Sequence, residues 1–380
     1  DDLIVDGTIA YSAITAPAAS ADPAYSGLNA ADVAASNTDD DTSGFAPQAL
    51  VVEVHGGTGL IGNLNGVWEP GEIAQVEPAW RNVGNVPVPL AGTGTAIAGP
   101  AGAIYGVEDA TASYGTIAAG ATADCFATSG NCFAVGVSDP ATRPATHWDA
   151  TFTESLSTGA AQFWALHVGE SFSDVPPGAF AYTFIETLLH SGITAGCSAT
   201  TYCPGATLTR WQMAVFIAKA LVGDAVPAAG TVPGVGDYSC TPGGASVFLD
   251  VPPQDAGCRF IHYIAAQGVT AGCGGGNYCP AATLTRWQMA VFIAKALVGD
   301  AVPVAGTVPG VGDYSCTAGG ASVFLDVPAE DAGCRFIHYI AAQGVTAGCG
   351  GGNYCPATPL TRDQMAVFMT KGFALQLYGP

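Results

Sequence analysis

The stretch GVTAGCGGGNYCPAATLTRWQMAVF, residues 268–292, decides the architecture of the C-terminal half of the chain. It recurs as GITAGCSATTYCPGATLTRWQMAVF at 192–216 and as GVTAGCGGGNYCPATPLTRDQMAVF at 344–368, so successive copies begin 76 residues apart (268 − 192 and 344 − 268). A fixed period of this length indicates a repeated structural unit. Linkers rich in Gly, Pro and Val, residues 223–244 and 299–320, separate the three copies.

Each copy predicts a helix, a loop and a second helix. Copy two opens with Phe-x-Asp-Val-Pro, in which Asp250 is expected to cap a first helix over 259–267. The second helix is predicted to begin after Thr285, because Thr285 and Gln288 have the spacing of a capping box. The equivalent opening aspartates of the other copies are Asp174 and Asp326.

The ordered elements F-x-D-V, amphipathic helix, G-[IV]-T-A-G-C, Y-C-P and L-T-R-x-Q-M-A-V-F, found three times over about residues 170–375, resemble the S-layer homology (SLH) domain. The resemblance implies that three SLH repeats pack as an α-helical bundle with pseudo-threefold symmetry. It also implies attachment, since in many bacteria this unit holds a surface protein to a cell-wall polysaccharide.

The resemblance also identifies candidate glycan-binding residues. The family usually opens its second helix with Thr-Arg-Ala-Glu and places the arginine near the glycan groove, which here corresponds to Arg210, Arg286 and Arg362. This chain departs from that pattern, because Trp211 and Trp287 follow two of these arginines. An exposed Trp suits sugar stacking or a subunit interface, and core packing is the alternative. The arginines could instead pair with neighbouring carboxylates beside the helix caps.

Residues 50–169 predict a different domain. Short alternating runs such as 50–54 and 162–168, with few helix signals, favour an antiparallel β-sandwich of immunoglobulin-like class. This half resembles the sandwich modules that accompany SLH repeats on bacterial surfaces. The expected organisation is a multidomain chain, listed in order: N-terminal arm 1–49, sandwich 50–169, repeat one 170–222, linker with repeat two 223–298, and linker with repeat three 299–380.

The chain has twelve cysteines, an even number that mostly falls in closely spaced pairs. Three of the pairs have C-x5-C spacing, and the absence of C-x2-C or spaced His pairs, which are typical of zinc sites, favours disulfides over zinc. The expected bridges are Cys125–Cys132, Cys197–Cys203, Cys240–Cys258, Cys273–Cys279, Cys316–Cys334 and Cys349–Cys355.

The N-terminal arm carries one strand-like segment, in which Leu3, Val5, Ile9 and Tyr11 fall on one face. So short a strand needs partners for its backbone groups. Two arrangements would supply these partners. The strand could add to the sandwich of a neighbouring copy, which would link subunits, or it could fold onto the chain's own sandwich.

Composition narrows the function classes. The formal net charge is −21 and only 11% of residues are charged, so nucleic acid is not an expected partner. No apolar run reaches the length of a membrane span, which argues against membrane insertion. The cysteines predict an oxidising compartment, and the chain beginning at Asp1 is read as a mature secreted form located extracellularly at the cell surface.

Metal and catalytic motifs are weak. Asn63, Asn65 and Glu72 match oxygen-ligand positions of a calcium loop, but Ile61 stands at its first position, and an Asn-Gly turn explains the same residues. No other cofactor is implied. His190, His262 and His338 are interpreted as repeated packing residues of the first helices, and no catalytic motif is present. The chain is therefore predicted not to be an enzyme.

Two functional hypotheses remain. The first is a structural protein that assembles with other copies of itself into an S-layer, coat or filament through its sandwich, arm and repeats. The second is an anchor that binds cell-wall polysaccharide and displays the sandwich as an adhesive or spacer.

Overall fold

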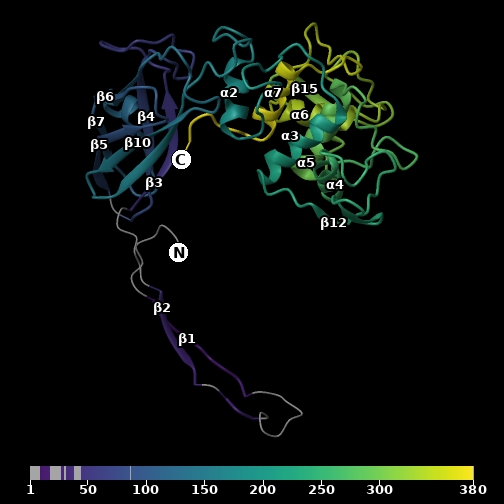
Figure 1. Cartoon of the computed structure of the whole chain (residues 1–380), viewed down its shortest axis with the longest axis horizontal. Coiled ribbons are helices and arrows are strands. Elements are labelled where there is room, and N and C mark those ends of the chain that lie inside the picture. The colour runs from purple at the N-terminus through teal and green to yellow at the C-terminus, as the bar shows by residue number, and fades with distance from the viewer. Residues whose placement is uncertain (1–8, 18–26, 30, 38–43, 86, 380) are drawn as a thin grey trace. The chain divides into compact units, whose positions relative to one another are not determined.

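The computed structural model describes residues 9–17, 27–29, 31–37, 44–85 and 87–379 (Figure 1). The chain divides into two compact units. One comprises residues 1–141, 150–166 and 378–380, and the other comprises 142–149 and 167–377.

The first unit is built from two β-sheets. One has the order β3 (Phe45–Val52), β4 (Ile73–Asn82), β9 (Phe133–Val137), β6 (Tyr105–Asp109), with β8 (Thr122–Asp124) also pairing with β4. The other has the order β11 (Ala161–His167), β10 (Asp149–Leu156), β5 (Val88–Ala98), β7 (Thr111–Ile117). A short helix, α1 (Cys125–Ser129), follows β8. The β-rich N-terminal region predicted from the alternating sequence is therefore present.

The sheets share an aromatic core. Trp80 of β4 meets Trp164 of β11 edge-on, with 5.7 Å between ring centroids, and Phe133 of β9 meets Phe152 of β10 at 5.0 Å. All four side chains are buried. Strand β10 alternates inward and outward residues, as a strand with one covered face must.

The N-terminal arm contains a two-stranded ribbon. Strand β1 (Ile9–Ala13) pairs antiparallel with β2 (Val33–Asn37), and Tyr11 lies opposite Ala35 (Figure 1). Leu3 and Val5 of the predicted strand lie outside the described residues. The strand at Ile9 and Tyr11 has backbone partners in β2 of the same arm, a pairing that neither alternative predicted. Addition of the arm to a sandwich, of this chain or of a neighbouring copy, stays a prediction.

The second unit holds the three copies, each with two helices. They are α2 (Tyr182–His190) and α3 (Arg210–Val222), α4 (Cys258–Ala266) and α5 (Arg286–Val298), and α6 (Cys334–Ala342) and α7 (Arg362–Gly372). The first helix of copy two lies within one residue of its prediction, and α5 begins with the Thr285–Gln288 capping box.

The linkers are more ordered than their composition indicated. Each contains a β-hairpin, β12 (Ala229–Val232) with β13 (Gly236–Ser239), and β14 (Ala305–Val308) with β15 (Gly312–Ser315). Gly, Pro and Val in such a linker also suit a short hairpin, because Gly permits the turn and Val packs from the strands. Val232 and Tyr238 are buried.

Asp250 does not cap the first helix, which corrects the prediction for that residue. Its carboxylate accepts hydrogen bonds from the backbone N–H groups of Tyr278 and Cys279, each at 2.7 Å. Cys279 has a left-handed backbone with φ of 59°, which turns the two successive N–H groups toward one acceptor. The residue before α4 is Gly257, which offers no side chain for a cap. Asp174 and Asp326 make the same pair of bonds in their copies.

Hydrogen bonds join the three copies in a ring. The Leu208 N–H donates to the Leu360 carbonyl, Leu284 to Leu208, and Leu360 to Leu284. These leucines immediately precede the capping threonines of the second helices and are fully buried. In this ring each copy therefore donates one hydrogen bond and accepts one.

The structure contains six disulfides, and each joins the two cysteines that the sequence paired. The three C-x5-C bridges close the loop between the helices of a copy. Two longer bridges, Cys240–Cys258 and Cys316–Cys334, join the end of a linker hairpin to the first residue of the next helix.

Candidate functional site

Three equivalent arginines open the second helices and reach into the neighbouring copy. Arg210, Arg286 and Arg362 are 5–6% exposed. In each case Nε donates to the backbone carbonyl of a tyrosine in the next copy, Tyr278, Tyr354 and Tyr202 respectively. The arginine carbonyl in turn accepts from that tyrosine's hydroxyl.

Arg210 shows how such a charge is accommodated. Its guanidinium carbon lies 4.8 Å from the Tyr278 ring centroid and 5.4 Å from that of Phe292, a cation–π arrangement. Burial lowers the pKa of Arg210, but an arginine stays protonated in proteins. The sequence had also allowed these arginines to pair with carboxylates. The contacts of Arg210 are instead with two aromatic rings and a backbone carbonyl. Within the described part of the chain, Nη2 of Arg210 is buried without a hydrogen-bond partner.

Two of these arginines line grooves at equivalent positions. A groove of about 450 Å³ lies between Arg210 and copy two, and it is bordered by Gly272, Trp287, Gln288 and Lys295. A second groove, of about 310 Å³, lies between Arg286 and copy three, with Gly348, Gln364 and Lys371 at the positions 76 residues later. Phe180 and Phe184 add an apolar wall to the second groove. The site therefore combines a cation, an amide and apolar surface.

The tryptophans that follow the arginines are not core residues. Trp211 is 38% exposed, while Trp287 is half-buried and forms part of the wall of the first groove. In copy three Asp363 stands at this position, and its carboxylate accepts a hydrogen bond from the Gln364 N–H. One exposed ring, one half-buried ring and one carboxylate therefore occupy the three equivalent positions.

The candidate calcium residues lie around a cluster of three carboxylates. The sequence pointed to Glu72 but not to Glu53 or Glu69. The Asn63 side chain donates to Glu69 at 2.9 Å, its N–H donates to Glu72, and the Asn65 side chain donates to Glu69 at 2.7 Å. Glu53, Glu69 and Glu72 are 1%, 2% and 8% exposed. Burial raises the pKa of Glu72 to about 8.

The same segment also forms the Asn-Gly turn that was the alternative. The Asn63 side-chain oxygen accepts from the Asn65 N–H, and Gly66 has a φ of 83°. Carboxylate and amide oxygens are the ligands Ca²⁺ prefers, so Glu53 and Glu69 would join Asn63 and Glu72 if calcium binds. Calcium binding stays a prediction.

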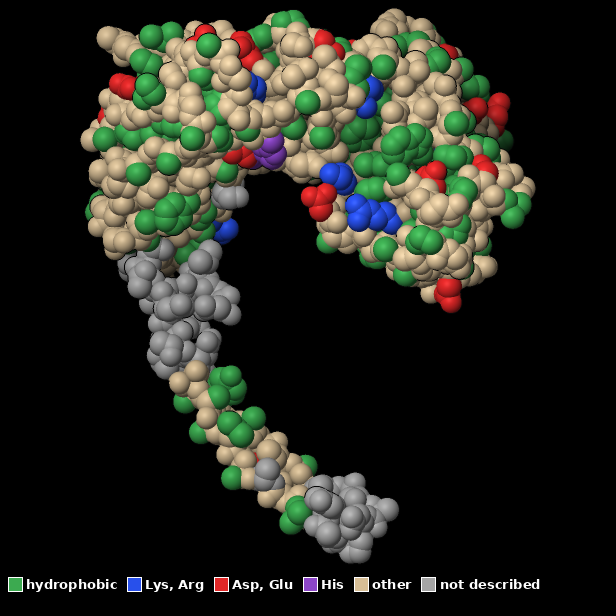
Figure 2. Space-filling model, in the orientation of Figure 1, with side chains coloured by type: hydrophobic (Ala, Val, Ile, Leu, Met, Phe, Trp, Pro, Cys, Tyr) green, Lys and Arg blue, Asp and Glu red, His purple; other side chains and the backbone are tan. Residues whose placement is uncertain are grey.

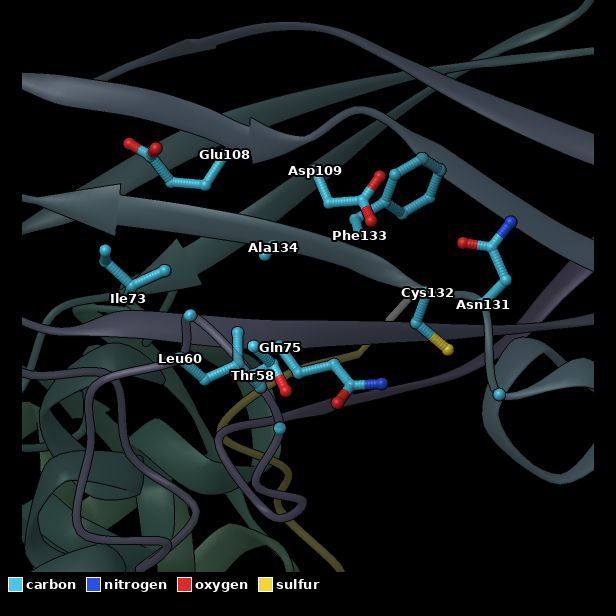
Figure 3. A pocket seen from close by; sticks show the side chains of 13 residues that line it. Thr58, Leu60, Ile73, Gln75, Glu108, Asp109, Asn131, Cys132, Phe133 and Ala134 are labelled. Atoms are coloured by element: carbon cyan, nitrogen blue, oxygen red, sulfur yellow. The ribbon is translucent and has the colours of Figure 1, made fainter.

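A further pocket, of about 450 Å³, lies on the β-rich unit beside β6 and β9. Figure 3 shows Glu108 and Asp109 with their carboxylates directed apart rather than toward one reacting position. An acid–base pair for hydrolysis would converge on the substrate.

The histidines are not three equivalent residues, which corrects their interpretation as a repeated feature. His262 and His338 are fully buried and contact the carbonyls of Cys258 and Cys334. The residue 76 positions before His262 is Glu186, while His190 lies one helical turn further along and faces Asp149. Copy one therefore differs in chemistry from the other two.

Charged side chains are sparse on one face of the molecule. Figure 2 shows few charged side chains on the face in view, scattered among uncharged ones. Among the described helices, none combines the length and apolar character needed to span a membrane.

Comparison with known proteins gives one family. The family model of the S-layer homology domain matches residues 171–214 and 323–366. These segments run from the start of copy one to the opening of α3 and from the start of copy three to the opening of α7. No curated protein matches the chain.

Proposed function

We propose, from the premise that two segments match the S-layer homology domain, that this chain is a secreted cell-surface protein that binds a cell-wall polysaccharide through the grooves at Arg210 and Arg286. S-layer homology domains occur in cell-surface proteins that anchor to the cell wall. The protein acts by attachment, with no catalytic step. All three copies are S-layer homology repeats in this proposal, supported by the 76-residue period and the ring of hydrogen bonds.

The proposal rests mainly on one observation, the buried and unpaired Nη2 of Arg210. A buried donor without a partner costs about 1–3 kcal/mol, and Nη2 of Arg210 is such a donor, in a side chain that borders the first groove. At the second groove, Nη2 of Arg286 donates to the Gly348 carbonyl at 3.2 Å. A polysaccharide offers hydroxyl or carboxylate oxygens that would satisfy Nη2 of Arg210, with the strength of a charge-assisted bond. The half-buried Trp287 supplies a ring against which the apolar face of a sugar can stack.

The β-rich unit fits the role of a displayed spacer or adhesive module. We assign it to the immunoglobulin-like sandwiches, because two antiparallel sheets share one aromatic core. The six disulfides suit an extracellular location, where cysteine pairs stay oxidised.

Co-sedimentation with purified cell-wall polysaccharide tests the proposal. We expect Arg210→Gln/Arg286→Gln to lower the affinity at least tenfold, since it removes both groove cations. Arg259→Gln/Arg335→Gln is the matched control: it removes the same charge from α4 and α6, outside both grooves. Its binding should equal that of the unmodified chain.

A second variant separates binding from folding. Because Trp287 is half-buried at the groove wall, Trp287→Ala should weaken binding while leaving the circular dichroism spectrum unchanged. Full binding by both the Arg210→Gln/Arg286→Gln and Trp287→Ala chains would show that the grooves are not the glycan site.

Self-assembly with other copies is the second candidate function. The observation that favours it is the β1–β2 ribbon, on which Tyr11 is 57% and Val33 57% exposed. An isolated two-stranded ribbon is at best marginally stable in water, so a partner surface would stabilise it.

A further inference from the structure

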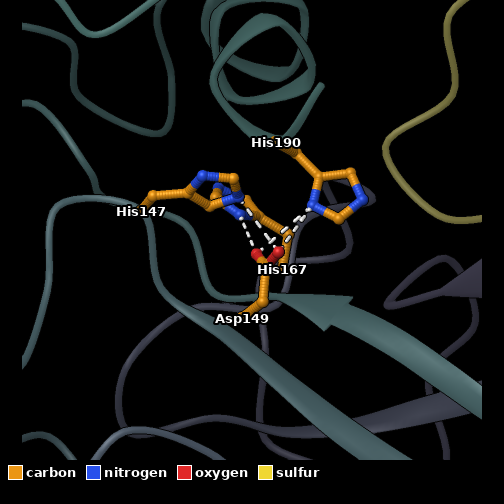
Figure 4. A group of neighbouring side chains, drawn as sticks. All are labelled: His147, Asp149, His167 and His190. Atoms are coloured by element: carbon orange, nitrogen blue, oxygen red, sulfur yellow. Dashed lines mark hydrogen bonds and ion pairs between the residues drawn. The ribbon is translucent and has the colours of Figure 1, made fainter. Parts of the chain in front are cut away.

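Four metal-binding side chains converge within the second unit. The Asp149 carboxylate lies 3.0 Å from Nε2 of His147, 2.8 Å from Nδ1 of His167 and 3.1 Å from Nδ1 of His190. Figure 4 shows the three imidazoles gathered around this carboxylate. One potential ligand atom from each of the four residues lies within 4.8 Å of all the others.

The backbone that carries these residues is held in place from several directions. Asp149 begins β10, His167 ends the neighbouring strand β11, and His190 ends α2. Arg143 donates to the carbonyls of Val168 and Gly169, directly after His167. The donor atoms therefore belong to regular elements and a braced segment, which favours a defined geometry.

Glu186 supports the most buried of the histidines. His167 is fully buried, and its Nε2 lies 2.8 Å from the Glu186 carboxylate, which also accepts from the N–H and hydroxyl of Ser171. A carboxylate of this kind orients a metal-bound imidazole by accepting a hydrogen bond from the N–H on its far nitrogen. Nδ1 of His167 then faces the cluster as a lone-pair donor.

This arrangement is specific to copy one. Residues 76 positions after Glu186 and His190 are His262 and Ala266, and in copy three His338 and Ala342. His262 and His338 lie beside cysteines, but these cysteines are oxidised in Cys240–Cys258 and Cys316–Cys334, so they offer no thiolate. Two of the residues that distinguish copy one therefore serve this cluster. His190 is a potential ligand, and Glu186 is the carboxylate that supports His167.

Geometry and charge both suit a small divalent ion. Tetrahedral Zn²⁺ with bonds of about 2.0–2.1 Å holds its donor atoms about 3.3 Å apart, close to the 2.8–3.2 Å between the imidazole nitrogens and Asp149. The Asp149 carboxylate supplies negative charge beside the three imidazoles, a combination of donors that such an ion accepts.

We infer that His147, Asp149, His167 and His190 bind one divalent transition-metal ion, with Zn²⁺ the ion that best matches three imidazoles and one carboxylate. Four protein ligands fill a tetrahedral shell, which is the pattern of structural zinc sites rather than catalytic ones. The ion ties the segment before β10 and the end of β11 to helix α2.

The experiment titrates Zn²⁺ into the full, untagged, metal-stripped chain by calorimetry, with Co²⁺ as a spectroscopic probe. We expect one Zn²⁺ per chain, the intense visible bands of four-coordinate Co²⁺, and a higher melting temperature with Zn²⁺. His147→Ala is the sharpest variant, because this side chain is 43% exposed and its loss should leave the fold intact. It should weaken Zn²⁺ binding at least tenfold, and His190→Ala should do the same.

The control is His55→Ala, which removes another part-exposed histidine that contacts a carboxylate, Glu77. This chain should bind Zn²⁺ as the unmodified one does. The inference is overturned if Zn²⁺ does not bind, if folded His147→Ala and His190→Ala chains bind it unchanged, or if Co²⁺ gives only the weak bands of a six-coordinate ion. Such results would leave four side chains that form a hydrogen-bond network.

Discussion

Glu154 is a carboxylate enclosed in the aromatic core of the β-rich unit. It accepts hydrogen bonds from the Tyr114 hydroxyl at 2.6 Å and the Trp164 ring nitrogen at 2.8 Å. Gly92 makes room for it, because a Cβ there would lie 2.2 Å from a Glu154 oxygen. Neither partner is charged, and burial raises the pKa of Glu154 despite these two bonds.

We expect this residue to make stability depend on pH. The pKa of Glu154 in the unfolded chain is about 4.3, so above that pH the folded state retains a proton that the unfolded state has released. The free energy of unfolding then falls as pH rises and levels off above the folded pKa. Glu154→Gln removes this titration, so the unmodified chain should lose stability relative to the variant as pH increases.

Denaturant midpoints of the two chains across the pH range measure the effect. Glu108→Gln, at an exposed position of β6, serves as the control for loss of one carboxylate. A stability difference between the unmodified and Glu154→Gln chains that stays constant with pH would contradict the argument.

Single residues also show what the sequence could and could not predict about the site. Arg210, Arg286 and Arg362 are recognisable because they recur in one motif. His147 and His167 have no such signal, since each is an isolated histidine in a strand-like segment. The pairing of β10 with β11 brings His167 to Asp149, and the end of α2 adds His190, whereas His147 is already only two residues from Asp149 in the sequence.

At the scale of elements, a disulfide joins each linker hairpin to the helix that follows it. Cys240 comes directly after β13 and pairs with Cys258, the first residue of α4. The equivalent position in copy one, 76 residues before Cys258, is Tyr182. Copies two and three therefore share a connection that copy one lacks.

We expect Cys240→Ala/Cys258→Ala to destabilise copy two. The bridge closes a loop with a sequence separation of 18, and closing a loop of that size stabilises by about 3 kcal/mol in the chain-entropy model. Hydrogen exchange should accelerate in α4 and in the β12–β13 hairpin. Helix α2 is the internal control, and equal exchange in α4 with and without the bridge would show that the hairpin holds by packing alone.

Helix boundaries in copy two were predictable because their signals are local. The capping box at Thr285 and the apolar face of α4 depend on residues three or four positions apart. The role of Asp250 could not be predicted from local signals. The two N–H groups that it binds lie 28 and 29 residues away, in a loop where Cys279 has a left-handed backbone conformation.

At the scale of the whole molecule, the boundary between units departs from the predicted domains. Residues 142–149 and 167–169 were assigned to the sandwich, yet they belong with the three copies. Arg143 provides the physical reason, since it binds the carbonyls of Val168 and Gly169 and the hydroxyl of Ser171. These bonds join two segments that are distant in sequence.

The N-terminal arm provides the prediction that concerns assembly. Deleting residues 1–12 removes most of β1 and leaves β2 without its pairing partner. If the arm links subunits, the shortened chain should remain a folded monomer under conditions in which the full chain forms polymers. Electron microscopy and light scattering give the comparison, and an unchanged melting temperature confirms that the rest is intact. Polymers formed equally well without these residues would exclude the arm as the linker.

The sequence by itself determined whatever depends on neighbouring or periodic residues. The threefold period, the cysteine pairs, the capping box at Thr285 and the strand alternation all follow from spacings that can be counted along the chain. The tertiary structure alone decided which distant groups meet. It placed the Arg210 guanidinium on Tyr278, Asp149 among three histidines, and Glu186 behind His167. These contacts exist because burial requires each charged group to find partners, and partners distant in sequence become neighbours only when the chain has folded.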